Sequence, residues 1–221
     1  MNTPPLRLVI CGTDTDVGKT IVSALFVQGL EATYWKPVQS GTEGGGDRQR
    51  VIDLLELPQE RWHPEAYAFQ APVSPHWAAE REEKCIDPDQ LQLPAIAGPL
   101  VVETAGGLMV PLTRQWLQIQ QLERWQLPVV LVARSELGTL NHTLLSLEAL
   151  RKRKIPILGL VINGPAHADN PRTLNELGQI PLLCELPPLE QLNAAALARQ
   201  WHVQNVKAKV ETEINRLQAS R

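Results

Sequence analysis

Short apolar runs alternate along the chain with stretches of helical periodicity, and glycine and proline residues separate the two kinds of segment. The apolar runs are rich in β-branched residues, which is typical of strands buried on both faces of a sheet. The pattern predicts strands at Leu6–Cys11, Ala32–Val38, Leu100–Glu103, Pro128–Ala133, Ile157–Asn163 and Leu182–Leu186. It predicts helices at Gly18–Gln28, Arg48–Leu55, Leu140–Lys152, Leu189–Arg199 and Val206–Leu217.

This alternation predicts an α/β fold of the P-loop NTPase-like kind: a doubly wound, mostly parallel sheet with helices on both faces. No repeat, low-complexity tract or linker divides residues 1–221, so we expect a single domain. The segment from Pro58 to Pro99 is rich in proline and predicts at most one or two short helices. Ligands of such sheets bind beyond the carboxyl ends of the strands, so the polar residues that follow each strand are the candidates for function.

Composition excludes several classes of function. The formal net charge is −3, which does not favour nucleic acid as a partner, and no apolar run reaches the length of a membrane span. Residues Met1–Pro5 lack the charged and apolar regions of a secretory signal, and we expect a cytoplasmic protein. Cys11, Cys85 and Cys184 show no metal-ligand spacing. Because Cys11 and Cys184 lie in apolar runs, we expect both in the core.

The segment after the first predicted strand has the features of a phosphate-binding loop. It is Gly12-Thr13-Asp14-Thr15-Asp16-Val17-Gly18-Lys19-Thr20, in which Gly-Lys-Thr begins a helix. Backbone N–H groups and the helix N-terminus of such a loop surround a phosphate. Lys19 is expected to reach the β- and γ-phosphates, and the Thr20 hydroxyl to ligate Mg²⁺. Thr13 stands where the strict pattern has glycine or alanine, and the alternative is an ordinary turn with a surface lysine.

Two carboxylates in this loop need an explanation, because Asp14 and Asp16 would repel a polyphosphate. Each should therefore cap a backbone group, bind through a metal ion or face a cationic substrate. A substrate that carries ammonium groups would suit them.

Polar residues also follow the other predicted strands. Lys36 could stabilise negative charge on a transferred phosphoryl group or on a carboxylated intermediate, although a solvated lysine is the alternative. Glu103 is placed to hold Mg²⁺ as a Walker B carboxylate does. Asp47 is a second candidate for the metal, and it could also cap the Arg48–Leu55 helix. Asn163 could contact an adenine edge or simply form a turn.

Taken in order, these segments resemble those of dethiobiotin synthetases. The motifs that carry the resemblance are Gly12–Thr20, Lys36–Gly41, Pro72–His76, Glu103–Gly107, Gly138–His142 and Asn163. The similarity extends from Leu6 to about Leu189. Asp16 stands where many members have glutamate, and Thr104 stands where many have glycine.

The resemblance implies a homodimeric enzyme whose substrates are ATP, CO₂ and 7,8-diaminononanoate (diaminopelargonate), with Mg²⁺. One amine takes up CO₂ to form a carbamate, and the γ-phosphoryl group transfers to it. The second amine then attacks and expels phosphate, which leaves dethiobiotin and ADP.

The resemblance also implies a role for individual residues. Catalysis falls to Thr15, Lys19 and Lys36. The nucleotide is held by Thr13, Asp14, Asp16, Val17, Gly18, Lys19, Thr20 and Asn163. The metal is held by Thr20, Asp47 and Glu103, with Asp53 as the alternative to Asp47. The substrate is contacted by Thr15, Lys36, Ser40, Ser74 and Gly106, and its tail carboxylate by Gly138 and Asn141 of the partner subunit. Some members add a tyrosine across the dimer; no tyrosine follows Tyr67 here, and Asn170 or Asn175 are the candidates to replace it.

Two other functions on a related fold are open alternatives. One is a nucleotide switch ATPase of the partition or septum-positioning kind, but those proteins usually carry a further lysine early in the phosphate loop, and Gly12–Asp16 has none. Their membrane-targeting C-terminal helix is also poorly matched by Val206–Leu217, which carries acids as well as lysines. The other is the synthetase part of a cobyrinate-type amidotransferase, which normally needs a glutaminase domain that this chain length does not accommodate.

Overall fold

The computed structural model describes residues 5–219, so residues 1–4, which include most of the N-terminal segment considered above, lie outside it. Its main sheet has the strand order β4-β2-β6-β1-β7-β8-β9, and all neighbouring strands are parallel. These strands are β1 (Arg7–Gly12), β2 (Thr33–Trp35), β4 (Trp62–His63), β6 (Leu100–Gly107), β7 (Val129–Arg134), β8 (Ile157–Asn163) and β9 (Leu182–Leu186). The predicted doubly wound α/β fold is confirmed.

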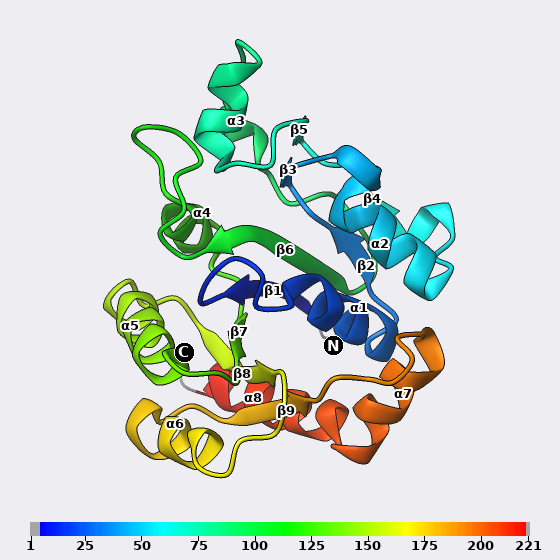
Figure 1. Ribbon diagram of the computed structural model, residues 1–221, viewed down its shortest axis with the longest axis vertical. Coiled ribbons are helices and arrows are strands. Elements are labelled where there is room, and N and C mark those ends of the chain that lie inside the picture. Colours follow the sequence, from blue (N-terminus) through cyan, green and yellow to red (C-terminus); the bar gives the residue numbers. More distant parts are fainter. Residues whose placement is uncertain (1–4, 220–221) are drawn as a thin grey trace.

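Helices cover both faces of this sheet (Figure 1). One face packs against α1 (Lys19–Gly29), α2 (Gly46–Leu55), α7 (Ala194–Val203) and α8 (Val206–Ala219). The other packs against α4 (Gln118–Trp125), α5 (Thr139–Lys152) and α6 (Asn170–Gly178). Side chains alternate between the faces along each strand, so that Ile10 of β1 points to the α1 face and Cys11 to the other. Cys11 and Cys184 are buried in the core, as expected.

The predicted strand Ala32–Val38 is wrong, because the structure divides it. Strand β2 ends at Trp35, and the chain then enters a separate two-stranded parallel sheet of β3 (Val38–Ser40) and β5 (Tyr67–Phe69). Pro37 lies at the break, where its missing N–H cannot contribute to a sheet ladder. Lys36 therefore lies at the carboxyl edge of the main sheet, at the junction between the two sheets.

The proline-rich segment contains one helix, α3 (Pro75–Arg81), which agrees with the expectation, together with 3₁₀ turns at Gln59–Arg61 and Pro88–Gln90. Helices α4 and α6 were not predicted. Helix α7 begins at Ala194 rather than near Leu189, because the Asn193 side chain accepts a hydrogen bond from the N–H of Ala196 and caps the helix there. Helix α8 begins at Val206, as predicted.

Helix α2 begins two residues before the predicted start. Its N-cap is Gly45, in a left-handed conformation, and Asp47 lies inside the first turn. The capping role considered for Asp47 is therefore wrong, and its carboxylate is available for other partners. Within residues 5–219, no helix combines the length and the apolar character needed to cross a membrane.

Candidate active site

The phosphate loop joins β1 to α1 at the carboxyl edge of the sheet, in the middle of the face seen in Figure 1. Gly18 caps α1 with a φ of 91°, and a Cβ atom there would lie 2.1 Å from Nδ2 of Asn163. Only glycine fits this conformation and this close approach. The Asn163 Nδ2 donates to the Val17 carbonyl oxygen over 3.1 Å, so the end of β8 supports the loop from behind.

The negative charge of the Asp14 carboxylate is balanced by a backbone N–H group and by an arginine. One carboxylate oxygen accepts a hydrogen bond from the N–H of Thr15 at 2.7 Å, and the other is 2.7 Å from Nη2 of Arg134, at the end of β7. Sequence reasoning did not single out Arg134, whose partner is 120 positions away along the chain. Lys19 donates to the Asp14 carbonyl oxygen at 2.9 Å, which folds its ammonium group over the same loop.

Four polar side chains converge beside the loop, from α1, α2, β6 and the segment between β2 and β3. The Thr20 hydroxyl donates to Asp47 Oδ1 at 2.9 Å and lies 3.0 Å from Glu103 Oε1. The Lys36 ammonium lies 2.5 Å from Asp47 Oδ2 and 3.0 Å from Glu103 Oε1. Glu103 is fully buried and Lys36 is 4% exposed, so this cluster operates at low dielectric, where each ionic contact is strong.

Charge and burial act in opposite directions on these groups. Burial alone would lower the pKa of Lys36, but the neighbouring carboxylates of Glu103 and Asp47 outweigh it and raise that pKa. Burial would raise the pKa of Asp47, but the Lys36 charge and hydrogen bond lower it. The pKa of Lys19 is lowered, first by burial and then by the charge of Lys36. Lys36 and Asp47 are therefore both ionised at neutral pH.

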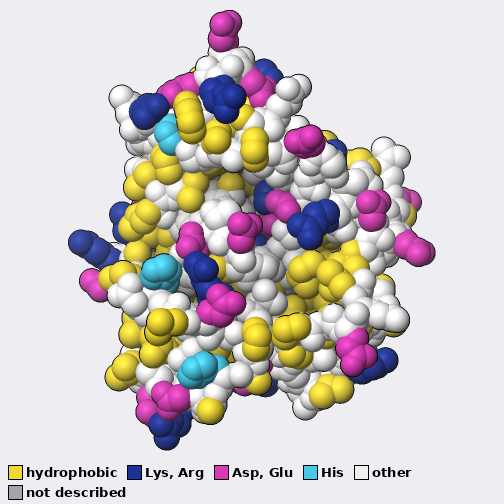
Figure 2. Space-filling model, in the orientation of Figure 1, with side chains coloured by type: hydrophobic (Ala, Val, Ile, Leu, Met, Phe, Trp, Pro, Cys, Tyr) yellow, Lys and Arg dark blue, Asp and Glu magenta, His cyan; other side chains and the backbone are white. Residues whose placement is uncertain are grey.

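A cleft of about 730 Å³ opens onto this cluster, and Figure 2 shows acidic and basic side chains gathered in the hollow at the middle of the face. Most of the candidate site residues line it: Thr15, Asp16, Gly18, Lys19, Thr20, Lys36, Ser40, Asp47, Ser74, Glu103 and Gly106. The Ser40 hydroxyl oxygen is buried there and has no hydrogen-bond partner within residues 5–219, so a bound ligand could supply one.

The remaining candidates lie outside the lining of the cleft. Thr13, Asp14, Val17 and Asn163 form or support the phosphate loop. Gly138 and Asn141 lie at the start of α5, where Gly138 is the N-cap. Asp53 does not line the cleft, and its carboxylate accepts a hydrogen bond from Gln49, which favours Asp47 as the metal ligand. Asn170 and Asn175 donate to the backbone carbonyls of Ser135 and Ile180.

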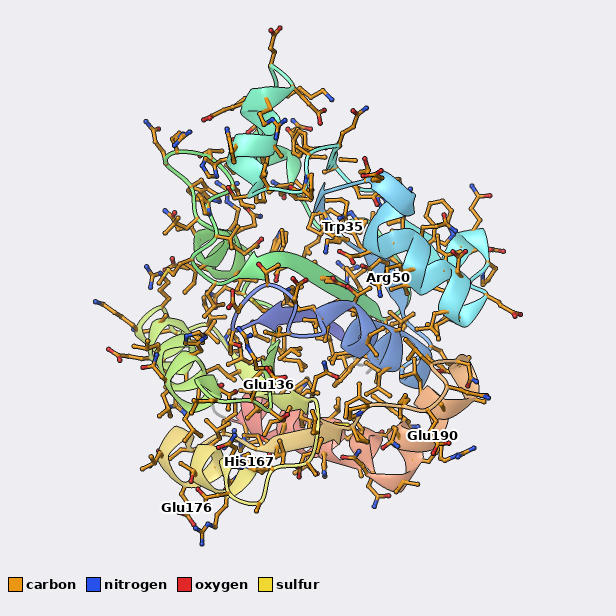
Figure 3. All side chains as sticks on the ribbon, in the orientation of Figure 1. Trp35, Arg50, Glu136, His167, Glu176 and Glu190 are labelled. Carbon is orange, nitrogen blue, oxygen red and sulfur yellow. The ribbon has the colours of Figure 1, made fainter. Side chains whose placement is uncertain are left out.

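Arg50 and Gln39 are among the lining residues that were not predicted as site residues. Arg50 of α2 adds an exposed cation to the rim (Figure 3). It lies three positions after Asp47, so helical spacing could have indicated it. Gln39 fixes the start of α2: its Oε1 accepts from the N–H of Asp47 at 3.2 Å, and its Nε2 donates to the Gly41 carbonyl oxygen. In the segment between Gln39 and Asp47, Gly44, Gly45 and Gly46 all have a positive φ.

The oxygen donors fit a magnesium ion. Hydroxyl and carboxylate oxygens from Thr20, Asp47 and Glu103 converge, and hard cations prefer such ligands. Among the described residues, no three acidic, histidine or cysteine side chains form a complete metal cage. Magnesium suits this arrangement, because it usually binds one or two carboxylates and takes its other ligands from water and phosphate.

The comparisons with known proteins agree with this geometry. A family described as an AAA domain matches residues 6–196. ATP-dependent dethiobiotin synthetases of Rhodopseudomonas palustris strains HaA2 and BisB5 are 51% and 52% identical to the chain, over 86% and 89% of its length and 89% and 92% of theirs. The chain belongs to the dethiobiotin synthetase family. This membership makes it an enzyme and confirms the resemblance inferred from the motifs.

The chain is also similar to a bifunctional biotin biosynthesis protein in sequence and to two other proteins in fold. A biotin biosynthesis bifunctional protein of Bordetella avium is 52% identical over 87% of this chain, which spans 42% of that protein. The septum site-determining protein MinD from Pyrococcus horikoshii, complexed with Mg-ADP, aligns with a TM-score of 0.57. That alignment covers 96% of this chain and 97% of MinD at 14% identity, so it shows a shared fold alone. A ParA family ATPase from Chlorobium tepidum gives a TM-score of 0.52 at 14% identity, over 95% of this chain and 98% of that one.

Proposed function

We propose that the chain is an ATP-dependent dethiobiotin synthetase of biotin biosynthesis, which uses CO₂ and 7,8-diaminononanoate to form dethiobiotin, ADP and phosphate. The observation that carries the proposal is the convergence of Lys19, Lys36 and the Thr20–Asp47–Glu103 oxygens in one cleft. Relatives that share about half of their residues with the chain bear that enzyme's name.

The reaction needs alignment and charge neutralisation rather than a covalent nucleophile. A carbamate oxygen attacks the γ-phosphorus and ADP leaves, so that a poor leaving group becomes a good one. The second amine then attacks the carbamate carbon, expels inorganic phosphate and loses its proton, which closes the five-membered urea. Both steps gain from reactants held close together in a cationic environment.

The residues of the cleft suit this chemistry. Backbone N–H groups of the phosphate loop, the start of α1 and Lys19 hold the nucleotide phosphates. Lys36 stays charged because its two carboxylate neighbours raise its pKa, and it lies where it can neutralise the carbamate or the transferred phosphoryl group. Thr15, Ser40 and Ser74 supply hydroxyl groups for orienting the substrate. Asp16, also on the lining, can attract an ammonium group of the diamine.

Thr20, Asp47 and Glu103 would hold Mg²⁺, which when bound neutralises the phosphate oxygens of ATP. In this proposal Asn163 contacts the adenine ring in addition to its support of the phosphate loop. Lys36 pairs with Asp47 and Glu103, which are two of these proposed metal ligands. The same carboxylates would therefore hold both Mg²⁺ and the Lys36 ammonium group that faces the substrate.

The proposal includes a homodimer. The first N–H groups of α5, at Gly138–Asn141, lie away from the cleft of their own chain and would receive the tail carboxylate of a substrate bound to a second copy. It also treats residues 1–221 as one domain of a cytoplasmic enzyme.

The direct test measures phosphate release from ATP with Mg²⁺ and bicarbonate, with and without the diamine. We expect release to require the diamine and to yield a product that supports growth of a biotin auxotroph. ATP turnover that is independent of the diamine and stimulated by lipid or DNA would instead indicate a nucleotide switch ATPase.

A substitution tests the role assigned to Lys36. Lys36→Ala should abolish turnover while largely sparing nucleotide binding, because the phosphate loop is left intact. Lys84→Ala is the matched control, since Lys84 also pairs with a carboxylate, that of Glu82, but lies outside the cleft. Near-normal turnover of the Lys36 variant would remove this lysine from the proposed mechanism.

A further inference from the structure

Tyr34 has a buried hydroxyl group that the proposed reaction does not use. It lies in β2 and is 0% exposed, and its hydroxyl donates to Glu103 Oε2 at 2.9 Å. The sheet register explains the contact: Tyr34 lies beside Val101 of the neighbouring β6, and Glu103 follows two residues later on the same face. This is the face that α1 covers, so both side chains point toward Thr20.

The two oxygens of Glu103 have separate partners. Oε1 faces Thr20 and Lys36 at 3.0 Å each, whereas Oε2 accepts from Tyr34. A carboxylate without a fixed partner can rotate and exchange its oxygens, or bind a cation with both. A hydroxyl donor on Oε2 prevents this and leaves Oε1 to face the cleft.

We infer that Tyr34 is a positioning residue for the metal site: its hydroxyl fixes the rotation of Glu103 so that Oε1 alone is presented to the cation. The inference rests on the metal role of Glu103 in the proposed function. A residue that orients a metal ligand typically changes metal affinity by about 10–100-fold when it is replaced.

Tyr34 also packs in the hydrophobic core, so the effect of its hydroxyl must be separated from that of its ring. Tyr34→Phe keeps the ring and removes only the hydroxyl, which leaves Oε2 of a fully buried carboxylate without its donor. Tyr67→Phe is the matched control. Its hydroxyl accepts a hydrogen bond from the N–H of Asp87 and Tyr67 does not line the cleft.

The primary experiment measures the affinity of Mn²⁺ for the ADP complex by electron paramagnetic resonance. We expect Tyr34→Phe to weaken Mn²⁺ binding about 10-fold or more while metal-free ADP binding changes less than about twofold. Tyr67→Phe should leave both values unchanged. Equal Mn²⁺ affinities for Tyr34→Phe and wild type would overturn this inference alone, whereas a wild-type protein that does not bind Mn²⁺ with ADP would refute the proposed function as well.

A second measurement needs no substitution of Tyr34. The chain has two tyrosines, so 3-fluorotyrosine labelling gives two ¹⁹F resonances, and Tyr67→Phe assigns them. Adding Mg²⁺ to the ADP complex should shift the Tyr34 resonance and not that of Tyr67, because the cation draws charge from the carboxylate that accepts the Tyr34 hydrogen bond. In a Glu103→Gln background this shift should be lost. A Tyr34 resonance that does not shift when Mg²⁺ is added, or that shifts equally in the Glu103→Gln variant, would contradict the inference.

Discussion

Replacing Lys36 by methionine should destabilise the protein as well as inactivate it. The substitution keeps an apolar stem of similar length but removes the charge that faces Asp47 and Glu103. Breaking a buried ion pair by removing one partner costs about 3–5 kcal/mol, because the remaining charge is left uncompensated in a low-dielectric site. The side chains of Lys36, Asp47 and Glu103 are 5%, 23% and 0% exposed, so solvent can screen only part of this cost.

The pH dependence of this loss follows from the sign of the shifts. Lys36 lowers the pKa of Asp47 below its ordinary 3.8, so Asp47 contributes stability that is present above that value and is lost as the pH falls through the lower, folded pKa. The Lys36 pKa is raised above 10.5, so its contribution persists until the pH passes that higher value. The difference in stability between wild type and Lys36→Met should therefore be full at pH 7 and shrink below about pH 4.

Urea unfolding followed by circular dichroism measures this difference. With an m-value of about 2–3 kcal/mol per molar urea, the midpoint of Lys36→Met should fall by about 1–2.5 M at pH 7. Added Mg²⁺ should restore part of the loss by replacing the missing positive charge. Lys84→Met, which removes a lysine 55% exposed beside Glu82, should cost less than about 1 kcal/mol. A loss as small as that of the control, or one independent of pH, would refute the electrostatic reasoning.

Three further substitutions test other parts of the structure. Gly18→Ala should weaken ADP binding at least about 10-fold by calorimetry, because a φ of 91° and the contact with Asn163 exclude a Cβ atom; unchanged affinity would contradict this account of the loop. Gly29→Ala should cost about 1–3 kcal/mol in urea unfolding without changing ADP affinity, since its Cβ would lie 2.2 Å from the Trp201 ring, and an unchanged midpoint would show that the ring can move away. Arg50→Ala should weaken ADP binding several-fold at low salt and less at 0.5 M salt, because exposed charges are screened; the same loss at both salt concentrations would argue against a long-range electrostatic role.

The sheet could be predicted closely from the sequence where the strands are continuous and apolar. The bounds of β8 and β9 are those expected, and β1 and β7 differ by one residue at each end. Such strands are buried on both faces, so each one is a continuous run of apolar, β-branched residues that can be recognised in the sequence. Helix α4 could not be recognised in the same way, because it has eight residues and buries the polar side chains Gln118 and Gln121.

The candidate site followed from residues placed directly after strands, because parallel strands bring their carboxyl ends to one edge. The supporting contacts did not follow. Tyr34 reaches Glu103 across 69 positions, and Arg134 reaches Asp14 across 120. Which distant side chains meet depends on strand order and register, and neither could be predicted from the pattern of residues along the chain.

Helix α2 carries a consequence for how the enzyme responds to heat. Its first turn begins at Gly46 and follows Gly44 and Gly45. All three glycines have a positive φ, their backbone gains more freedom than that of other residues when released, and Gly45 provides no side-chain cap. The N–H of Asp47 instead donates a hydrogen bond to the side-chain oxygen of Gln39, which lies in β3. Fraying that begins at this turn would withdraw a carboxylate from the cleft while the sheet stays folded, so thermal inactivation should precede global melting.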